Sequence, residues 1–183
     1  MTIRTYLKTS LTIAALLALP LAQAATMAKE DYKAGKERIS TQYKAAKAAC
    51  SPLKDNAKDI CVEEAKATEK VAYAELEYSY TGKPADQTKL LETRAKTVYN
   101  VAKERCDDRA GNDKDVCVKE AKAVEVKALA DAKTGKQVGE ARRDGAGDKM
   151  DADYKVAIEK CDSLASEAKT SCVNSAKAKF GKS

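Results

Sequence analysis

The segment Tyr99-Asn-Val-Ala-Lys-Glu-Arg-Cys106, followed after ten residues by Cys117-Val-Lys-Glu-Ala-Lys-Ala123, decides the fold of this 183-residue chain. The pattern occurs three times, with a tyrosine seven residues before each first cysteine and Val-x-x-Ala-Lys-Ala directly after each second cysteine. The cysteines of a unit are always 11 residues apart, and the pairs are Cys50 and Cys61, Cys106 and Cys117, and Cys161 and Cys172. A pattern that recurs at a fixed period indicates a repeated supersecondary unit.

The cysteine spacing determines how each unit must fold. Eleven residues on one continuous helix would separate the two cysteines by about 16 Å, whereas a disulfide needs Cα atoms roughly 4.4–6.8 Å apart. A bond within a unit therefore requires the chain to reverse between its cysteines. Turn or helix-start residues lie at the midpoints, namely Asp55-Asn56, Gly111-Asn112 and, more weakly, Ser166-Glu167. We predict three helical hairpins, each closed by its own disulfide about one helical turn below the bend on both arms.

Alanines flank the cysteines at matched positions and predict the contact between the two arms. Residues 25–183 contain 29 alanines but only 23 large apolar residues (Ile, Leu, Val, Met and Phe). The position four before each first cysteine should face the position four after its partner, which pairs Ala46 with Ala65, Ala102 with Ala121, and Ala157 with Ala176. Such small side chains bury little area, so we expect the disulfides to supply much of the stability that a larger core would give.

The remaining sequence divides the chain into repeats and linkers. The units extend approximately over residues 28–80, 88–133 and 148–180, and two linkers are predicted, one over 81–86 and a longer, glycine-rich one over 134–148. No stretch alternates at period two, so no strand is predicted. The expected fold is all-α, with helices of roughly 15–27 residues arranged in a bundle or a short solenoid.

The first 24 residues have the composition of a secretory signal peptide. Arg4 and Lys8 precede an apolar run over residues 11–21, and Ala22-Gln23-Ala24 supplies a cleavage site. The apolar run is about half the roughly 20 residues that a membrane-spanning helix needs. We therefore expect cleavage after Ala24, a helical repeat domain over 25–183, a periplasmic location and no stable membrane insertion.

The distribution of charges and the residue types present argue against several functional classes. Residues 25–183 carry 32 basic and 28 acidic side chains, interleaved along the chain, which is typical of a solvated helix surface and not of specific nucleic-acid binding. The chain has no histidine and no C-x-x-C pair, and regularly spaced cysteines in an exported protein are usually structural. We expect no enzyme activity, no metal site and no cofactor.

A tyrosine cluster is the only local candidate for a binding site. It consists of Tyr73, Tyr78 and Tyr80, and Tyr73, Leu76 and Tyr80 share one helical face. This face is interpreted either as an aromatic recognition patch or as packing between neighbouring hairpins.

The repeated pattern Tyr-x-x-Ala-x-x-x-Cys and Cys-Val-x-x-Ala-Lys-Ala resembles that of a group of uncharacterised secreted proteins of beta-proteobacteria. The Ala/Lys/Glu composition is also similar to that of the helical stalk of TolA. The resulting expectation is a non-enzymatic periplasmic binding or scaffolding protein of the cell envelope, with envelope stress as one context and an envelope protein or polymer as partner. Two alternatives stay open, a thiol-based metal-binding or redox protein and a weak binder of anionic lipid or nucleic acid. The oligomeric state is not predicted.

Overall fold

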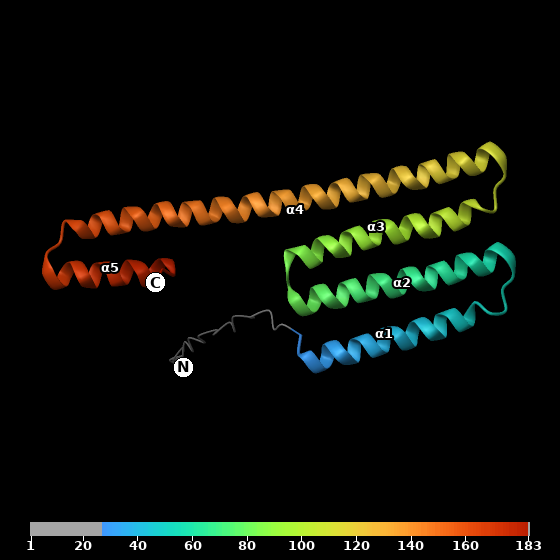
Figure 1. Cartoon of the computed structure of the whole chain (residues 1–183), viewed down its shortest axis with the longest axis horizontal. Coiled ribbons are helices and arrows are strands. Elements are labelled where there is room, and N and C mark those ends of the chain that lie inside the picture. The colour runs from blue at the N-terminus through green and yellow to red at the C-terminus, as the bar shows by residue number, and fades with distance from the viewer. Residues whose placement is uncertain (1–26, 183) are drawn as a thin grey trace, which may run out of the picture.

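The computed structural model describes residues 27–182, which form five α-helices joined by short turns (Figure 1). The helices are α1 (Lys29–Ala49), α2 (Asp55–Thr81), α3 (Pro84–Cys106), α4 (Gly111–Asp162) and α5 (Ser166–Phe180). No strand occurs among the described residues. This confirms the predicted all-α class.

The helices lie side by side in one antiparallel layer. Each helix packs against its neighbours in the chain, so α1 contacts α2, α2 contacts α3, α3 contacts α4 and α4 contacts α5. Helices further apart in the chain do not contact one another within residues 27–182. In Figure 1, α4 extends well beyond α3, and α5 returns along its far end on the same side as α3. The arrangement is an open bundle one helix thick, extended like a short solenoid.

The three predicted disulfides are confirmed. Cys50–Cys61, Cys106–Cys117 and Cys161–Cys172 each join Cα atoms 5.7 Å apart and connect the two arms of a hairpin. The expected position of the disulfide is wrong for the first arm, because each first cysteine lies at the end of its helix and not one turn below the bend. On the second arm the position is close to the expected one, because Cys61 lies about one and a half helical turns after the start of α2 at Asp55. The second helix begins at the predicted midpoint, at Asp55, Gly111 and Ser166, all with positive φ.

The glycine-rich segment 134–148 is not a linker, contrary to the prediction. It lies inside α4, which runs unbroken for 52 residues and is shared by the second and third hairpins. The shorter linker does break the chain, because Gly82 ends α2 with a φ of 62° and Pro84 starts α3. Segment 134–148 has no proline, and an interior glycine costs about 1 kcal/mol without forbidding a helix.

The core consists of small side chains. The buried apolar residues are Ile39, Cys50, Ala65, Leu90, Ala95, Cys106, Ala132, Cys161 and Ala176. The alanine seam is therefore only partly formed, since Ala65 and Ala176 are buried while Ala46 is exposed. A single layer explains this result, because no third helix covers the outer side of a hairpin.

Candidate functional site

Two shallow grooves flank α3 on one face of the layer and are lined largely by apolar side chains. The groove between α2 and α3 has a volume of about 510 Å³ and is lined by Val71, Ala72, Val98 and Val101, among others. The groove between α3 and α4 has a volume of about 420 Å³. Val98 lines both grooves and is 57% exposed, so it forms the ridge between them. We refer to this surface as the apolar face.

The second groove extends the apolar face onto α4. Its apolar lining is Leu91, Ala95, Val98, Val124, Ala128 and Ala132. Glu125 also lines it and is buried, and its carboxylate is 2.6 Å from the Lys122 ammonium. This surface was not predicted from the sequence. The seven-residue spacing of Leu91 and Val98 on one helix was the available signal, but the number of neighbours of α3 could not be known from it.

Ion pairs cross the α2–α3 contact beside the first groove. Arg94 donates to Glu75 at 2.6 Å and Arg105 donates to Glu64 at 2.6 Å. Asn56 adds two hydrogen bonds at the turn end, from its amide to the Glu104 carbonyl at 3.0 Å and to the Asp108 carboxylate at 2.7 Å. These contacts fix how α2 and α3 are aligned along their length.

A third groove lies across α1, α2 and α3 and is basic. It has a volume of about 550 Å³ and is lined by four lysines, Lys36, Lys70, Lys89 and Lys96. Lys96 is partly neutralised by Glu92, at 3.8 Å. Two tyrosines, Tyr32 and Tyr73, contribute aromatic rings, and Glu77 and Asp86 add negative charge. The groove therefore combines positive charge with aromatic surface.

The predicted tyrosine cluster lies mainly in the contact between α1 and α2. The Tyr80 ring stacks on Tyr32 with centroids 4.4 Å apart, and the Tyr73 hydroxyl donates to the Lys36 carbonyl at 3.3 Å. Tyr78 is half-buried, and its carbonyl accepts the Gly82 N–H at 2.8 Å. The structure thus gives Tyr73 and Tyr80 packing contacts between the two arms of one hairpin.

Tyr32 has an altered acidity at this contact. Its hydroxyl donates a hydrogen bond to the Glu77 carboxylate. That bond stabilises the protonated phenol and raises the pKa of Tyr32 above the ordinary tyrosine value, with burial and the negative charge of Glu77 acting in the same direction.

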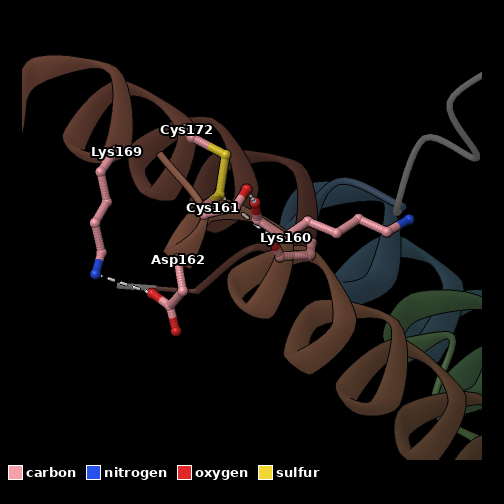
Figure 2. The surroundings of a disulfide bond; sticks show 7 residues. Lys160, Cys161, Asp162, Lys169 and Cys172 are labelled. Atoms are coloured by element: carbon pink, nitrogen blue, oxygen red, sulfur yellow. Dashed lines mark hydrogen bonds and ion pairs between the residues drawn. A yellow bond between two sulfur atoms is a disulfide. The ribbon is translucent and has the colours of Figure 1, made fainter. Parts of the chain in front are cut away.

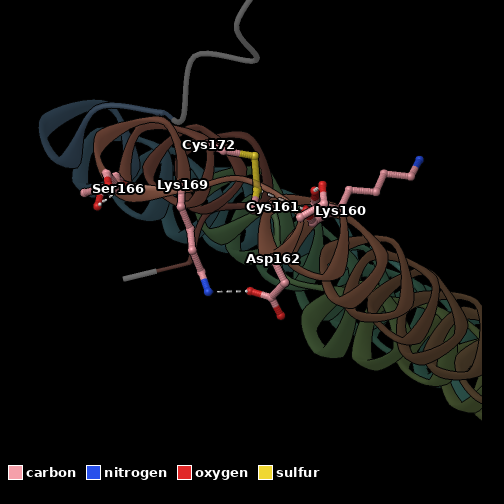
Figure 3. A network of polar contacts seen from close by, with 9 residues as sticks. Lys160, Cys161, Asp162, Ser166, Lys169 and Cys172 are labelled. Carbon is pink, nitrogen blue, oxygen red and sulfur yellow. Dashed lines mark hydrogen bonds and ion pairs between the residues drawn. A yellow bond between two sulfur atoms is a disulfide. The ribbon is translucent and has the colours of Figure 1, made fainter.

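The surroundings of the third disulfide show an ion pair that bridges the turn (Figure 2). Lys169 on α5 pairs with Asp162 at the end of α4, with nitrogen and oxygen 3.0 Å apart. Lys114 and Asp107 form the equivalent pair in the second hairpin, also at 3.0 Å. The first hairpin has Ser51 in place of the aspartate. Figure 3 shows the same turn with Ser166, where α5 begins.

The cysteines of the described segment are all in disulfides, and Cys50, Cys106 and Cys161 are each 1% exposed. Within residues 27–182, no three or more His, Cys, Asp or Glu side chains form a group that could hold a metal ion. None of the helices in this range combines the length and apolarity needed to cross a bilayer.

The predicted signal peptide, residues 1–24, lies outside the described residues. The disulfides are compatible with an extracellular or periplasmic location, because such bonds persist in oxidising compartments. In comparisons with family models, curated proteins and solved structures, no match to this chain is found.

Proposed function

We propose that this chain is a non-enzymatic binding or scaffolding protein of the cell envelope, exported to the periplasm, and that its apolar face binds a helical segment of a partner. The observation that carries the proposal is the pair of grooves on either side of Val98. In a layer one helix thick, no helix covers either face of the layer at α3. The apolar stripe of a helix is normally buried against a second layer of structure, which a partner would supply here. An amphipathic helix from another protein fits such a groove.

The rim favours a partner helix that carries charges of both signs. Arg94 and Glu75 lie beside the first groove, and Asp131 lines the second. Mixed charges at the edge of an apolar groove contribute more to register and specificity than to affinity. The disulfides support this role, because they hold hairpins with little core in one shape before binding occurs.

The test compares two leucine substitutions of equal exposure. Leu91 in the second groove and Leu53 in the first turn are both 41% exposed. Capture from a periplasmic extract should retain a partner on the wild-type protein and on Leu53→Glu, and lose it on Leu91→Glu at unchanged melting temperature. Equal retention by both variants would refute binding through the apolar face.

The basic groove favours a second candidate function, weak binding of an anionic ligand. Four lysines of three neighbouring helices line one groove. Binding of this kind depends steeply on salt, because it is driven by release of counterions. Titration with anionic vesicles or single-stranded DNA at rising salt concentrations tests it, with Lys70→Gln/Lys89→Gln as the weakened variant and Lys44→Gln/Lys133→Gln as the charge-matched control. Equal binding by both double variants would exclude the groove.

A further inference from the structure

The outer edge of α4 is a long helical surface without a neighbour. Both α3 and α5 pack on the same side of α4 (Figure 1). The opposite side carries a stripe of exposed small and apolar side chains, formed by Val116, Ala123, Ala130, Thr134, Ala141, Ala152 and Val156, with the charged residues Lys127 and Asp148 between them. Residues spaced by seven and eleven positions remain on one side of a helix, so this stripe extends over most of α4.

The internal repeat indicates what fits this edge. In the first two units, the second arm α2 packs against the next first arm, α3. The first part of α4 is the second arm of unit two, and its last part, up to Cys161, is the first arm of unit three. If the units were joined alike, these two parts would pack against each other as α2 packs against α3. Within one straight helix they cannot meet.

The ion pairs of the α2–α3 contact are repeated at the matching positions of α4. Relative to the cysteines, Glu64 corresponds to Glu120 and Arg105 corresponds to Lys160. Equally, Glu75 corresponds to Asp131 and Arg94 corresponds to Lys149. Each of the two observed ion pairs thus has counterparts on α4 with the same signs of charge. The acidic counterpart lies on the first part of α4 and the basic counterpart on the last part.

The remaining polar contact is repeated as well. Asn56 donates to the Glu104 carbonyl and to Asp108, and the corresponding residues are Asn112, Glu159 and Ser163. The first apolar positions also correspond, since Ile60 and Ala67 of α2 match Val116 and Ala123 of α4. Val116 and Val156 are 42% and 53% exposed, and Val156 matches Val101 of α3. At one end of the α2–α3 contact, the corresponding side chains of α4 are smaller. Leu90 corresponds to Gly145, and Tyr78 corresponds to Thr134.

We propose that the edge of α4 binds the same edge of a second copy of this chain, with the two α4 helices antiparallel. In such a pair, Glu120 of one copy lies opposite Lys160 of the other, and Asp131 lies opposite Lys149. Residue 140 is midway between 120 and 160 and also midway between 131 and 149, so a single two-fold axis at this position satisfies both pairs. The charge pattern of α4 is therefore complementary to itself in one antiparallel register.

The glycine-rich centre of α4 suits this arrangement. Ala141 lies on the stripe and the half-buried Gly145 lies next to it, both close to the proposed axis, and small residues there let two helices approach closely. The first part of each α4 then receives the unit-three arm of the other copy. Each copy thereby completes the repeated packing that its own straight helix prevents.

The test measures mass by sedimentation equilibrium over a range of protein concentrations. We expect a reversible dimer for the full-length secreted chain. Ala141→Glu places two like charges at the axis and should raise the dimer dissociation constant at least about tenfold, a change that corresponds to about 1.4 kcal/mol. Ala34→Glu, on an exposed position of α1, is the control and should leave the mass unchanged.

Charge exchange identifies the register. Glu120→Lys and Lys160→Glu should each weaken the dimer, whereas mixing the two variants should restore it, because each Lys then faces a Glu. A monomer at all concentrations overturns the proposal. If that monomer loses stability in both single variants and regains it in Glu120→Lys/Lys160→Glu, then α4 has opened at its glycines and unit three packs back on its own chain instead.

Discussion

Gly35 of α1 lies directly against Leu76 of α2, so closely that a Cβ atom built on Gly35 would be 2.8 Å from the Leu76 Cδ1 atom. This glycine lets the two arms of the first hairpin approach without displacing the leucine. Gly35→Val should therefore lower the free energy of unfolding by about 1–3 kcal/mol through overpacking, measured by urea denaturation.

Gly135 supplies the matched control for this substitution. It is also an interior helical glycine, but nothing lies within 4 Å of a Cβ built on it. Gly135→Val should leave stability unchanged or slightly increased, because valine has a higher helix propensity than glycine. If Gly35→Val were as stable as Gly135→Val, the close approach of α1 and α2 would be incorrect.

The stacked rings of Tyr32 and Tyr80 should be energetically coupled. Their centroids are 4.4 Å apart, and aromatic pairs in such arrangements contribute about 0.5–1.5 kcal/mol beyond the area they bury. A double-mutant cycle with Tyr32→Ala and Tyr80→Ala should give a coupling energy in that range by thermal or urea unfolding. If the changes in unfolding free energy of the two single variants simply added up in the double variant, the rings would not stack in solution. Tyr80 would then be available for binding a partner.

The hydrogen bond from Tyr32 to Glu77 should make the stability of the protein depend on pH in the alkaline range. Because the pKa of Tyr32 is raised in the folded state, its contribution to stability is fully present below the ordinary tyrosine value of about 10 and is lost as pH rises through the higher folded value. NMR of ¹³Cζ-labelled tyrosine should show Tyr32 titrating at higher pH than an exposed tyrosine.

Glu77→Gln is the control for this titration. It removes the charge that favours the protonated phenol, so the pKa of Tyr32 should fall toward the ordinary value. A Tyr32 titration curve that is unchanged in Glu77→Gln would mean that another group causes the shift.

The hairpins and their disulfides could be predicted because they follow from local geometry. Cysteines 11 residues apart can bond only if the chain turns between them, and the turn residues were visible at Asp55, Gly111 and Ser166. The unbroken α4 could not be predicted in this way. Glycine content suggests a linker, but the backbone at 134–148 keeps a helical conformation in which strong helix formers surround the glycines.

The apolar face was missed for a different reason. Val98 and Val124 are ordinary residues of helices, and their exposure depends on how many layers the fold has. Periodicity indicates which side of a helix is apolar but not whether another helix covers it. The tyrosines were found by their clustering, yet only the observed partners Tyr32 and Lys36 show that Tyr73 and Tyr80 pack between the arms of one hairpin.

The starts of the second arms provide a test at equivalent positions. Gly111 and Ser166 have φ values of 54° and 49°, in the left-handed region that costs most residues about 1–2 kcal/mol. Gly111→Ala should therefore destabilise the protein by up to about 1 kcal/mol, and Ser166→Gly should stabilise it by a smaller amount. Gly147→Ala, at a helical glycine of α4 with open space around it, is the control and should stabilise. Differential scanning calorimetry separates these directions, and stabilisation by Gly111→Ala would contradict the left-handed geometry.

The third disulfide should hold α5 in place more strongly than the second disulfide holds α3. α5 has 15 residues and contacts only α4, and an isolated helix of that length is marginal in water. Closing a loop of this size contributes on the order of 3 kcal/mol, so Cys161→Ser/Cys172→Ser should leave α5 largely unprotected in hydrogen exchange while α1, α2 and α3 remain protected. In Cys106→Ser/Cys117→Ser, α3 still packs against α2 and α4 along its length, so its protection should fall much less. Full reduction of the wild-type protein should lower the melting temperature clearly. The far-ultraviolet circular dichroism signal of the helices should change little, since Ala, Lys and Glu favour helix locally. If α5 kept full protection without its disulfide, its contacts with α4, including Tyr154 against Phe180, would be sufficient to hold the hairpin closed.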